Sequence, residues 1–334
     1  MNYRELGNTG LRVSEIGFGA WGIGGPAKAG TMPIGWADWD LAASKRAIER
    51  SVELGITFFD TADFYGFGKS EELLGEVLGG RWNNLVVATK VGHVLGPDGS
   101  VQLDYTRSHI IEACDQSLRR LKKDVIDVYQ LHSAKLDHLE RGECIEAMEE
   151  LKRKGKVRAW GISLNTFAPE REGTWILDHR AGDTLQLVLN IVNQKALQEV
   201  IPRAQKLGYG IIARMPLQFG LLTGKFSDNT RFDPADHRSM RLPPQILERG
   251  NRLVARLTPI AERMNISLGA LALKFVLGHD SVSTVIPGIK NEAQAEQNAS
   301  ASGEPHLSRE DVAALHALYE VEFRQFLDHL RQAG

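Results

Sequence analysis

Eight short runs of apolar and β-branched residues alternate along this chain with longer segments in which apolar residues recur at helical spacing. Such alternation is typical of repeated β/α units around a parallel sheet. Eight parallel strands of this kind close into a barrel filled by layers of side chains. We therefore predict that residues 1–334 form one domain, a (β/α)8 or TIM barrel. The predicted strands are residues 15–19, 57–60, 85–90, 125–132, 157–163, 184–190, 210–215 and 282–286.

Two segments fall outside the repeat. Residues 3–13 predict an N-terminal hairpin that turns at Asn8-Thr9-Gly10. Residues 308–330 predict an extra C-terminal helix, because Ser308 and Asp311 resemble a capping box and an apolar stripe follows them. We expect this helix to pack on the outside of the barrel.

The region before the last strand is less regular. Residues 216–244 carry no periodic signal, whereas residues 247–264 predict one continuous helix.

An open doubly wound sheet is the alternative fold, and it requires a short glycine-rich turn between the first strand and the first helix. Here the glycine-rich segment, residues 17–25, is followed by a loop that is far too long before a helix begins.

The bulk properties exclude several classes of partner. Apolar residues make up 43% of the chain, charged residues 25%, and the net charge is −2. No basic field therefore indicates nucleic acid or an anionic membrane, and no targeting segment or membrane-spanning run is visible. The two cysteines, Cys114 and Cys144, lie on apolar helix stripes and are interpreted as buried thiols. We expect a cytoplasmic protein without a membrane or nucleic-acid partner.

Four polar residues stand at or just after the carboxyl ends of three successive predicted strands. They are Asp60, Tyr65, Lys90 and His132. In a barrel these positions converge on the face where active sites are built. Each residue alone has an ordinary structural explanation, such as a helix cap, a loop aromatic, a solvated strand end or a core histidine. All four together are not expected by chance.

These four side chains suit the reduction of a carbonyl group. A free tyrosine has a pKa near ~10, and a nearby ammonium such as that of Lys90 lowers it. Asp60 can hold Lys90 charged and in place, while a neutral His132 can donate a hydrogen bond to the substrate oxygen. No side chain supplies a hydride, so this chemistry requires a nicotinamide cofactor.

The chain resembles the aldo-keto reductase family over residues 3–301. This resemblance implies the barrel, an NADP(H)-dependent reductase activity and the catalytic tetrad Asp60, Tyr65, Lys90 and His132. The matching stretches include Phe59-Asp60-Thr61-Ala62-Asp63-Phe64-Tyr65-Gly66, Ser70-Glu71-Glu72-Leu73-Leu74-Gly75, Thr89-Lys90, Leu131-His132, Gly161-Ile162-Ser163, Gly220-Leu221-Leu222-Thr223-Gly224-Lys225 and Ile286-Pro287-Gly288.

The resemblance also implies cofactor contacts. At the nicotinamide it implies Ser163 and Gln186; an asparagine usually follows the serine, but here Leu164 intervenes and Asn165 comes next. The position where the family often stacks an aromatic ring is Arg214. For the phosphates and adenine, loops after strands seven and eight supply backbone N–H groups and lysines, and Lys290 favours NADP(H) over NAD(H). The full expected set is Gly19, Trp21, Asp60, Ser163, Asn165, Gln186, Arg214, Pro216, Leu217, Gly220, Leu222, Gly224, Lys225, Gly288, Lys290, Gln294 and Asn298.

Aromatic residues on the loops are the candidates for substrate contact: Trp21, Trp36, Phe64 and His93. An aromatic rim suits an apolar aldehyde or ketone, but sugars also stack on tryptophan, so the sequence does not select a substrate. The expected partner is a small carbonyl or alcohol, and the chain is compatible with a homo-oligomer.

Two other functions compete with a carbonyl reductase. A nucleotide-binding regulatory or sensor subunit would keep the barrel but turn over little, and the intact tetrad weighs against it. A metal-assisted lyase would need a cluster of His, Asp and Glu at metal-ligand spacing, which the sequence lacks. We therefore expect no metal.

Overall fold

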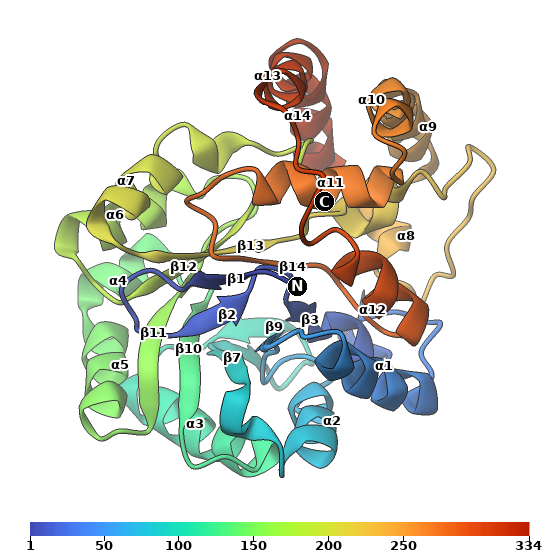
Figure 1. The fold of residues 1–334 in the computed structure, drawn as a ribbon. Coiled ribbons are helices and arrows are strands. Elements are labelled where there is room, and N and C mark those ends of the chain that lie inside the picture. The colour runs from blue at the N-terminus through green and yellow to red at the C-terminus, as the bar shows by residue number, and fades with distance from the viewer. Residues whose placement is uncertain (334) are drawn as a thin grey trace.

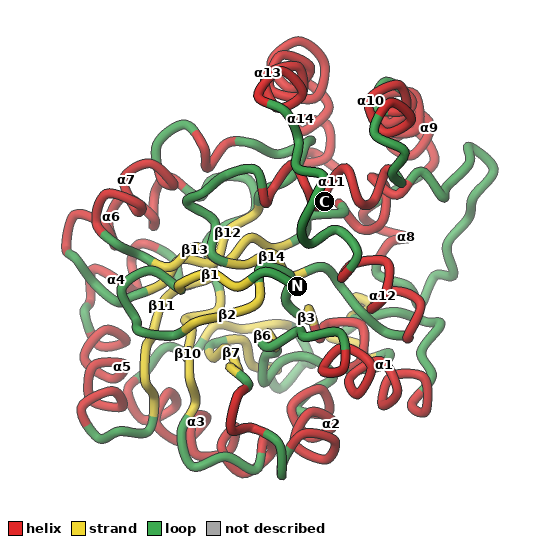
Figure 2. Tube along the Cα trace, viewed as in Figure 1, coloured by secondary structure: helices red, strands yellow, loops and turns green. Residues whose placement is uncertain are grey.

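The computed structural model describes residues 1–333, and its centre is a barrel of eight parallel strands ringed by helices (Figure 1 and Figure 2). The sheet closes because Ile16 pairs with Val285, and Gly19 with Gly288. A Cβ at Gly19 would lie 2.8 Å from the carbonyl oxygen of Pro287, so this approach requires glycine. The predicted (β/α)8 barrel is confirmed. Its strands, in chain order, are β3 (Phe18–Gly19), β6 (Phe58–Asp60), β7 (Val86–Val91), β10 (Ile126–His132), β11 (Val157–Ser163), β12 (Thr184–Val188), β13 (Gly210–Arg214) and β14 (Thr284–Ile286).

Helices with one apolar face cover the outside of the barrel. In Figure 2 they surround the yellow strands on all sides of the view. Several begin at the predicted caps, since Asp40 accepts from the backbone N–H of Ala43 and Thr106 from that of His109. The covering helices are α1 (Leu41–Glu53), α2 (Lys69–Leu78), α3 (Arg107–Leu121), α4 (Leu136–Arg141), α5 (Glu143–Arg153), α6 (Glu170–His179), α7 (Val200–Leu207), α11 (Leu268–Leu277) and α12 (Glu292–Ala299).

The predicted N-terminal hairpin is present, and it closes one end of the barrel. Its strands β1 (Tyr3–Glu5) and β2 (Arg12–Ser14) lie across the barrel strands in Figure 1. Leu6, Leu11 and Val13 are buried against apolar side chains of the barrel interior, including Phe58 and Val128. The interior is therefore filled at this end, and any cavity must open at the other.

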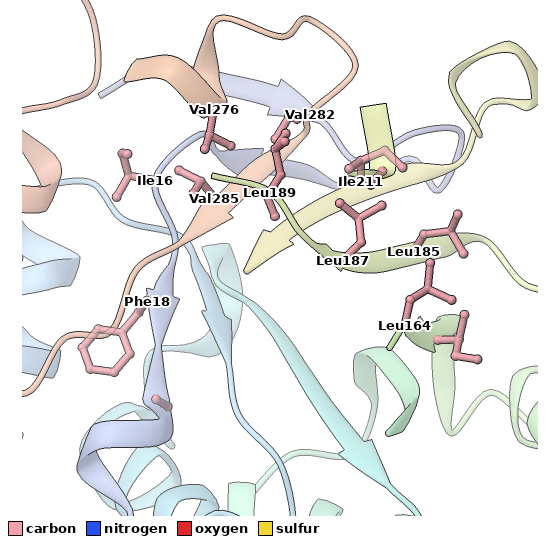
Figure 3. Close-up of a cluster of buried hydrophobic side chains, with 14 of the residues drawn as sticks. Ile16, Phe18, Leu164, Leu185, Leu187, Leu189, Ile211, Val276, Val282 and Val285 are labelled. Atoms are coloured by element: carbon pink, nitrogen blue, oxygen red, sulfur yellow. The ribbon is translucent and has the colours of Figure 1, made fainter. Parts of the chain in front are cut away.

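The larger apolar core lies between the barrel and its helices. Figure 3 draws part of it, with Val276 of α11, Val285 of β14, and Leu185 and Leu187 of β12 in one cluster. Cys114 and Cys144 are buried in this core as free thiols, as predicted. This packing holds the strand ends in fixed positions relative to one another.

Two predictions about the C-terminal third need correction. Residues 247–264 do not form one helix: they are divided between α9 (Pro244–Ala255) and α10 (Thr258–Arg263), because Pro259 cannot continue α9 and instead occupies the first turn of α10. The segment without periodicity, residues 216–244, contains the 3₁₀ helix η4 (Gln218–Thr223) and the short helix α8 (Arg238–Arg241).

The extra C-terminal helix is present outside the ring (Figure 1). It consists of α13 (Arg309–Leu318) and α14 (Arg324–Ala333), which are joined by a π-helical turn at Tyr319–Phe323. The predicted capping box of Ser308 and Asp311 begins it. The apolar stripe predicted for this helix consists of Val312, Leu315, Tyr319, Phe323 and Phe326. All of these are buried except Val312, which stays partly exposed.

Two small hairpins in the loops were not predicted. One is formed by β4 (Ala27–Ala29) and β5 (Met32–Ile34), the other by β8 (His93–Leu95) and β9 (Val101–Leu103). Their tips meet: a Cβ at Gly99 would lie 3.4 Å from the backbone nitrogen of Gly30. The remaining regular segments are the 3₁₀ helices η1 (Ala20–Ile23), η2 (Trp82–Asn84) and η3 (Lys195–Leu197).

Candidate active site

The alternation of side chains along the barrel strands brings polar groups into the open end of the barrel. Phe58 and Asp60 share one face of β6, and Val86 and Lys90 share one face of β7. The apolar member of each pair belongs to the apolar cluster that fills the barrel beneath the N-terminal hairpin. The polar member, two or four residues later, therefore lies inside the barrel near its carboxyl end.

Lys90 is fully buried, and its ammonium group contacts three oxygen atoms. Its Nζ lies 2.7 Å from Oδ2 of Asp60, 2.7 Å from the carbonyl oxygen of Thr61 and 3.1 Å from the hydroxyl oxygen of Tyr65. Burial alone would lower the pKa of Lys90, but Asp60 and Tyr65 together outweigh burial and the pKa is raised. Lys90 is therefore a fixed cation beside the Tyr65 oxygen.

Asp60 is held by two further donors. Its Oδ1 accepts from Nε2 of Gln186 at 2.6 Å and from Nε2 of Gln130 at 3.3 Å. The hydroxyl of Ser163 in turn lies 3.3 Å from Oε1 of Gln186. Ser163 and Gln186, predicted at the nicotinamide, thus belong to the same network as Asp60. Gln130 was not predicted, although the alternation that places His132 inside the barrel also places Gln130 there.

The pKa of Tyr65 is raised, whereas the sequence analysis expected Lys90 to lower it. Burial raises it, and this effect exceeds the lowering by the Lys90 ammonium, so the pKa of Tyr65 lies above its ordinary value. The expected net lowering was wrong, because the sequence does not show how far the hydroxyl is removed from water. The ring of Trp21 packs edge-on against Tyr65, with centroids 4.9 Å apart. At neutral pH the hydroxyl keeps its proton.

His132 stands beside Tyr65, with ring centroids 5.9 Å apart and an interplanar angle of 77°. Burial, together with the nearby His93, Lys90 and Arg214, holds the pKa of His132 well below its ordinary range. The ring is therefore neutral and can donate one hydrogen bond.

A cavity of about 1020 Å³ opens above these side chains. Trp21, Trp36, Phe64 and His93, the predicted substrate residues, all line it. Both hairpins contribute apolar wall residues that the sequence analysis missed, namely Met32, Ile34 and Val101. Their strands are only three residues long and were interpreted as loop, so periodicity could not reveal them.

Gly19, Asn165 and Arg214 also line the cavity. The guanidinium Nη2 of Arg214 donates to the carbonyl oxygen of Leu164 at 2.9 Å and to Oγ1 of Thr166 at 3.0 Å. Oδ1 of Asn165 accepts from the backbone N–H groups of Phe167 and Ala168, so this oxygen caps the turn. Arg214 therefore holds a defined position at the end of β13.

Most of the residues predicted at the phosphate and adenine end also line the cavity. These are Pro216, Leu217, Gly220, Lys225, Gly288, Lys290, Gln294 and Asn298. Leu222 and Gly224 do not. The turn of η4 places Leu222 in the apolar core, and Gly224 is the left-handed residue that ends this turn.

Cations gather in this part of the cavity. Lys290 and Arg238 both form ion pairs with Asp38, and Arg238 also pairs with Asp236. Partial burial and the neighbouring Arg238 and Lys290 lower the pKa of Lys225. Arg238 was not predicted, because it lies in the segment without periodicity. Three clustered cations against a cavity wall form a binding surface for an anion.

Residues 1–333 show neither a membrane-spanning helix nor a metal-ligand cluster. No helix in that range is both long and apolar enough to cross a membrane. The same residues contain no cluster of three or more His, Cys, Asp or Glu side chains suited to a metal ion.

Comparison with known proteins identifies relatives along nearly the whole chain. The model of the family described as "Aldo/keto reductase family" matches residues 15–320. A protein named "Probable voltage-gated potassium channel subunit beta" from Arabidopsis thaliana is 30% identical, with 90% of this chain and 91% of that protein covered. L-galactose dehydrogenase from the same plant is also 30% identical, with coverage of 95% and 94%.

Solved structures show the same fold. The holo form of an aldo-keto reductase from Bacillus halodurans superposes with a TM-score of 0.75 and 29% sequence identity. The match covers 95% of this chain and 96% of that one.

Proposed function

This chain belongs to the aldo/keto reductase family, and we propose that it transfers a hydride reversibly between NADP(H) and an aldehyde or ketone, with Tyr65 as general acid and base. Family membership implies an oxidoreductase that uses a nicotinamide cofactor; the NADP preference and the residue roles are our proposal. The observation that carries it is the buried Asp60–Lys90 pair, whose ammonium donates to the Tyr65 hydroxyl at 3.1 Å.

The cavity fits a phosphorylated dinucleotide. Its volume of about 1020 Å³ is at the upper end for small-molecule sites. The cations Lys225, Arg238 and Lys290 are close enough to affect one another's electrostatics, and a bound phosphate would relieve their repulsion. Hydrogen-bonding groups of Ser163 and Gln186 lie beside Asp60 and could face an amide.

When bound, the nicotinamide cofactor supplies the hydride. Tyr65 then donates its hydroxyl proton to the carbonyl oxygen, and Lys90 stabilises the phenolate that remains. Asp60 keeps Lys90 charged and fixed, so the ammonium need not reorganise during the reaction. The neutral His132 ring donates a hydrogen bond that orients the carbonyl. In the reverse direction, the Tyr65 phenolate removes the alcohol proton.

The raised pKa of Tyr65 predicts opposite pH profiles for the two directions. Reduction needs the protonated hydroxyl, so its kcat should stay level through neutral pH and fall only above pH ~10, where a free tyrosine already titrates. Oxidation needs the phenolate, so its kcat should rise with pH over the same range. Steady-state rates in both directions across a pH series test this. A reduction rate that falls already near neutrality would contradict the proton assignment.

Lys290 is proposed to bind the 2′-phosphate. Lys290→Ala should weaken NADPH binding by about 1.5–3 kcal/mol, which is about tenfold or more in Kd, while NADH binding changes little. Quenching of tryptophan fluorescence measures both constants. Lys206→Ala, on the exposed face of α7, is the matched control and should change neither. Equal effects on the two cofactors would remove Lys290 from the 2′-phosphate site.

A regulatory subunit is the second candidate, because a 30% identical relative is named a probable potassium channel subunit beta. Consumption of NADPH with a panel of aldehydes, ketones and sugars, repeated with NADH, separates the two. Turnover with any carbonyl supports the reductase. Tight NADPH binding without turnover of any substrate favours the regulatory subunit.

We also propose the domain organisation, the cellular location and the partners of this chain from its sequence and family. The chain acts as one domain on a small carbonyl or alcohol in the cytoplasm. It has no nucleic-acid or membrane partner, and a homo-oligomer is compatible with its sequence.

A further inference from the structure

Within residues 1–333, no side chain or backbone group gives the ring of His132 the hydrogen bond that normally orients such a residue. A functional histidine is usually fixed by a partner at its second ring nitrogen. Here Nδ1 of His132 is buried, and no atom of residues 1–333 hydrogen-bonds to it. A buried unpaired N–H is rarer than a buried unpaired acceptor. The ring proton therefore belongs on Nε2, the nitrogen that remains to donate.

The ring of His93 packs against the ring of His132 and can hold its orientation in place of a hydrogen bond. Its ring lies on that of His132, with centroids 4.1 Å apart and an interplanar angle of 30°. The His93 ring also packs edge-on against Phe64, the residue before Tyr65, with centroids 5.3 Å apart and an interplanar angle of 78°. His93 thus stands between the Tyr65 segment and His132.

The backbone is shaped to bring His93 to this place. Gly92 has a φ of +125°, and a Cβ there would lie 2.0 Å from the ring of Tyr105. That same tyrosine donates its hydroxyl proton to the carbonyl oxygen of His132 at 2.6 Å. The turn after Lys90 and the end of β10 are therefore joined through one aromatic side chain.

We propose that His93 is a positioning residue, which holds the neutral His132 ring in its donating orientation by face-to-face stacking. The proposal deepens the proposed function and rests on it. Two protonated rings would repel each other, but burial together with Lys90 lowers the pKa of His93 to about 4, so this ring is uncharged at neutral pH. A 1 Å displacement of a positioned group can cost about 10²-fold in rate.

Three variants test the role of His93 in turnover. His93→Ala removes the stack and should lower kcat roughly 10²-fold, with the Kd of NADPH nearly unchanged. His93→Phe keeps a stacking ring and should restore kcat to near the wild-type value. Leu95→Ala, on the exposed side of the same hairpin, controls for disturbance of the hairpin and should leave kcat unchanged. An unchanged kcat in His93→Ala, or no recovery in His93→Phe, would overturn the proposal.

A second readout does not depend on turnover. In protein with ¹⁵N-labelled histidine, NMR should show His132 as a single neutral tautomer with the proton on Nε2, in the wild type and in His93→Phe. The His93→Ala spectrum should show an averaged tautomer signal. If that spectrum equals the wild-type one, the positioning role is wrong even where Tyr65 proves catalytic. If the wild type reduces no carbonyl, the proposed function fails while this readout still decides the role of His93.

Discussion

Tyr65→Phe is expected to lower kcat for carbonyl reduction by about 10²- to 10⁴-fold, the range that a positioned general acid contributes. The substitution removes one oxygen atom and keeps the ring that packs edge-on against Trp21. The cavity walls stay in place, so the Kd of NADPH should remain nearly unchanged. Stopped-flow or steady-state loss of NADPH absorbance measures kcat, and tryptophan fluorescence measures Kd.

The matched control for this substitution is Tyr3→Phe. The hydroxyl of Tyr3 donates to the carbonyl oxygen of Gly55 at 3.1 Å, within the hairpin end of the barrel, and the residue is 38% exposed. Its removal should leave kcat unchanged. A Tyr65→Phe protein with near wild-type kcat would show that another group delivers the proton.

Lys90→Met is expected to cause the largest loss of stability, together with a loss of turnover. It leaves the Asp60 carboxylate buried without its cation, and breaking a buried pair in this way typically costs about 3–5 kcal/mol. Chemical denaturation measures the free energy of unfolding. The exposed pair of Lys45 and Glu76 offers the control, since Lys45→Met should cost only about 0–1 kcal/mol.

The double variant Asp60→Asn with Lys90→Met separates the charge effect from packing. Asparagine is neutral and can still accept from Gln186 and Gln130. The double variant should therefore be more stable than Lys90→Met alone, but equally inactive. If it is less stable than the single variant, the loss comes from packing around the lysine and not from the unpaired carboxylate.

The sequence predicted the barrel because strands alternate with helices, and it predicted the convergence of the tetrad because these residues stand at or just after strand ends. Asp60, Lys90 and His132 end apolar strands, and the carboxyl ends of barrel strands face one mouth. The alternation of side chains along β10 also places Gln130, two residues before His132, inside the barrel. The side chain of Leu222 lies in the apolar core. The sequence could not show this, because a family motif gives the position of a residue along the chain but not the side to which a 3₁₀ turn directs it.

Features set by tertiary contact were not predictable. The hairpins beside the cavity have three-residue strands, and their tips lie close together at Gly30 and Gly99. Arg238 owes its position to Asp38 and Asp236 and to the ring of Trp36, 4.6 Å from its guanidinium carbon. The direction of the Tyr65 pKa depends on the balance between burial and Lys90, which only the folded geometry gives.

The most direct test of hydride transfer uses NADPH that carries deuterium at both positions of the hydride-donating carbon. The wild-type protein is incubated with an aldehyde or ketone that the substrate panel identifies, or with the whole panel if none stands out. Mass spectrometry of the alcohol should find one deuterium on the former carbonyl carbon, and Tyr65→Phe should form almost none of this product. If NADPH binds but no labelled alcohol forms from any carbonyl, the chain is not a reductase.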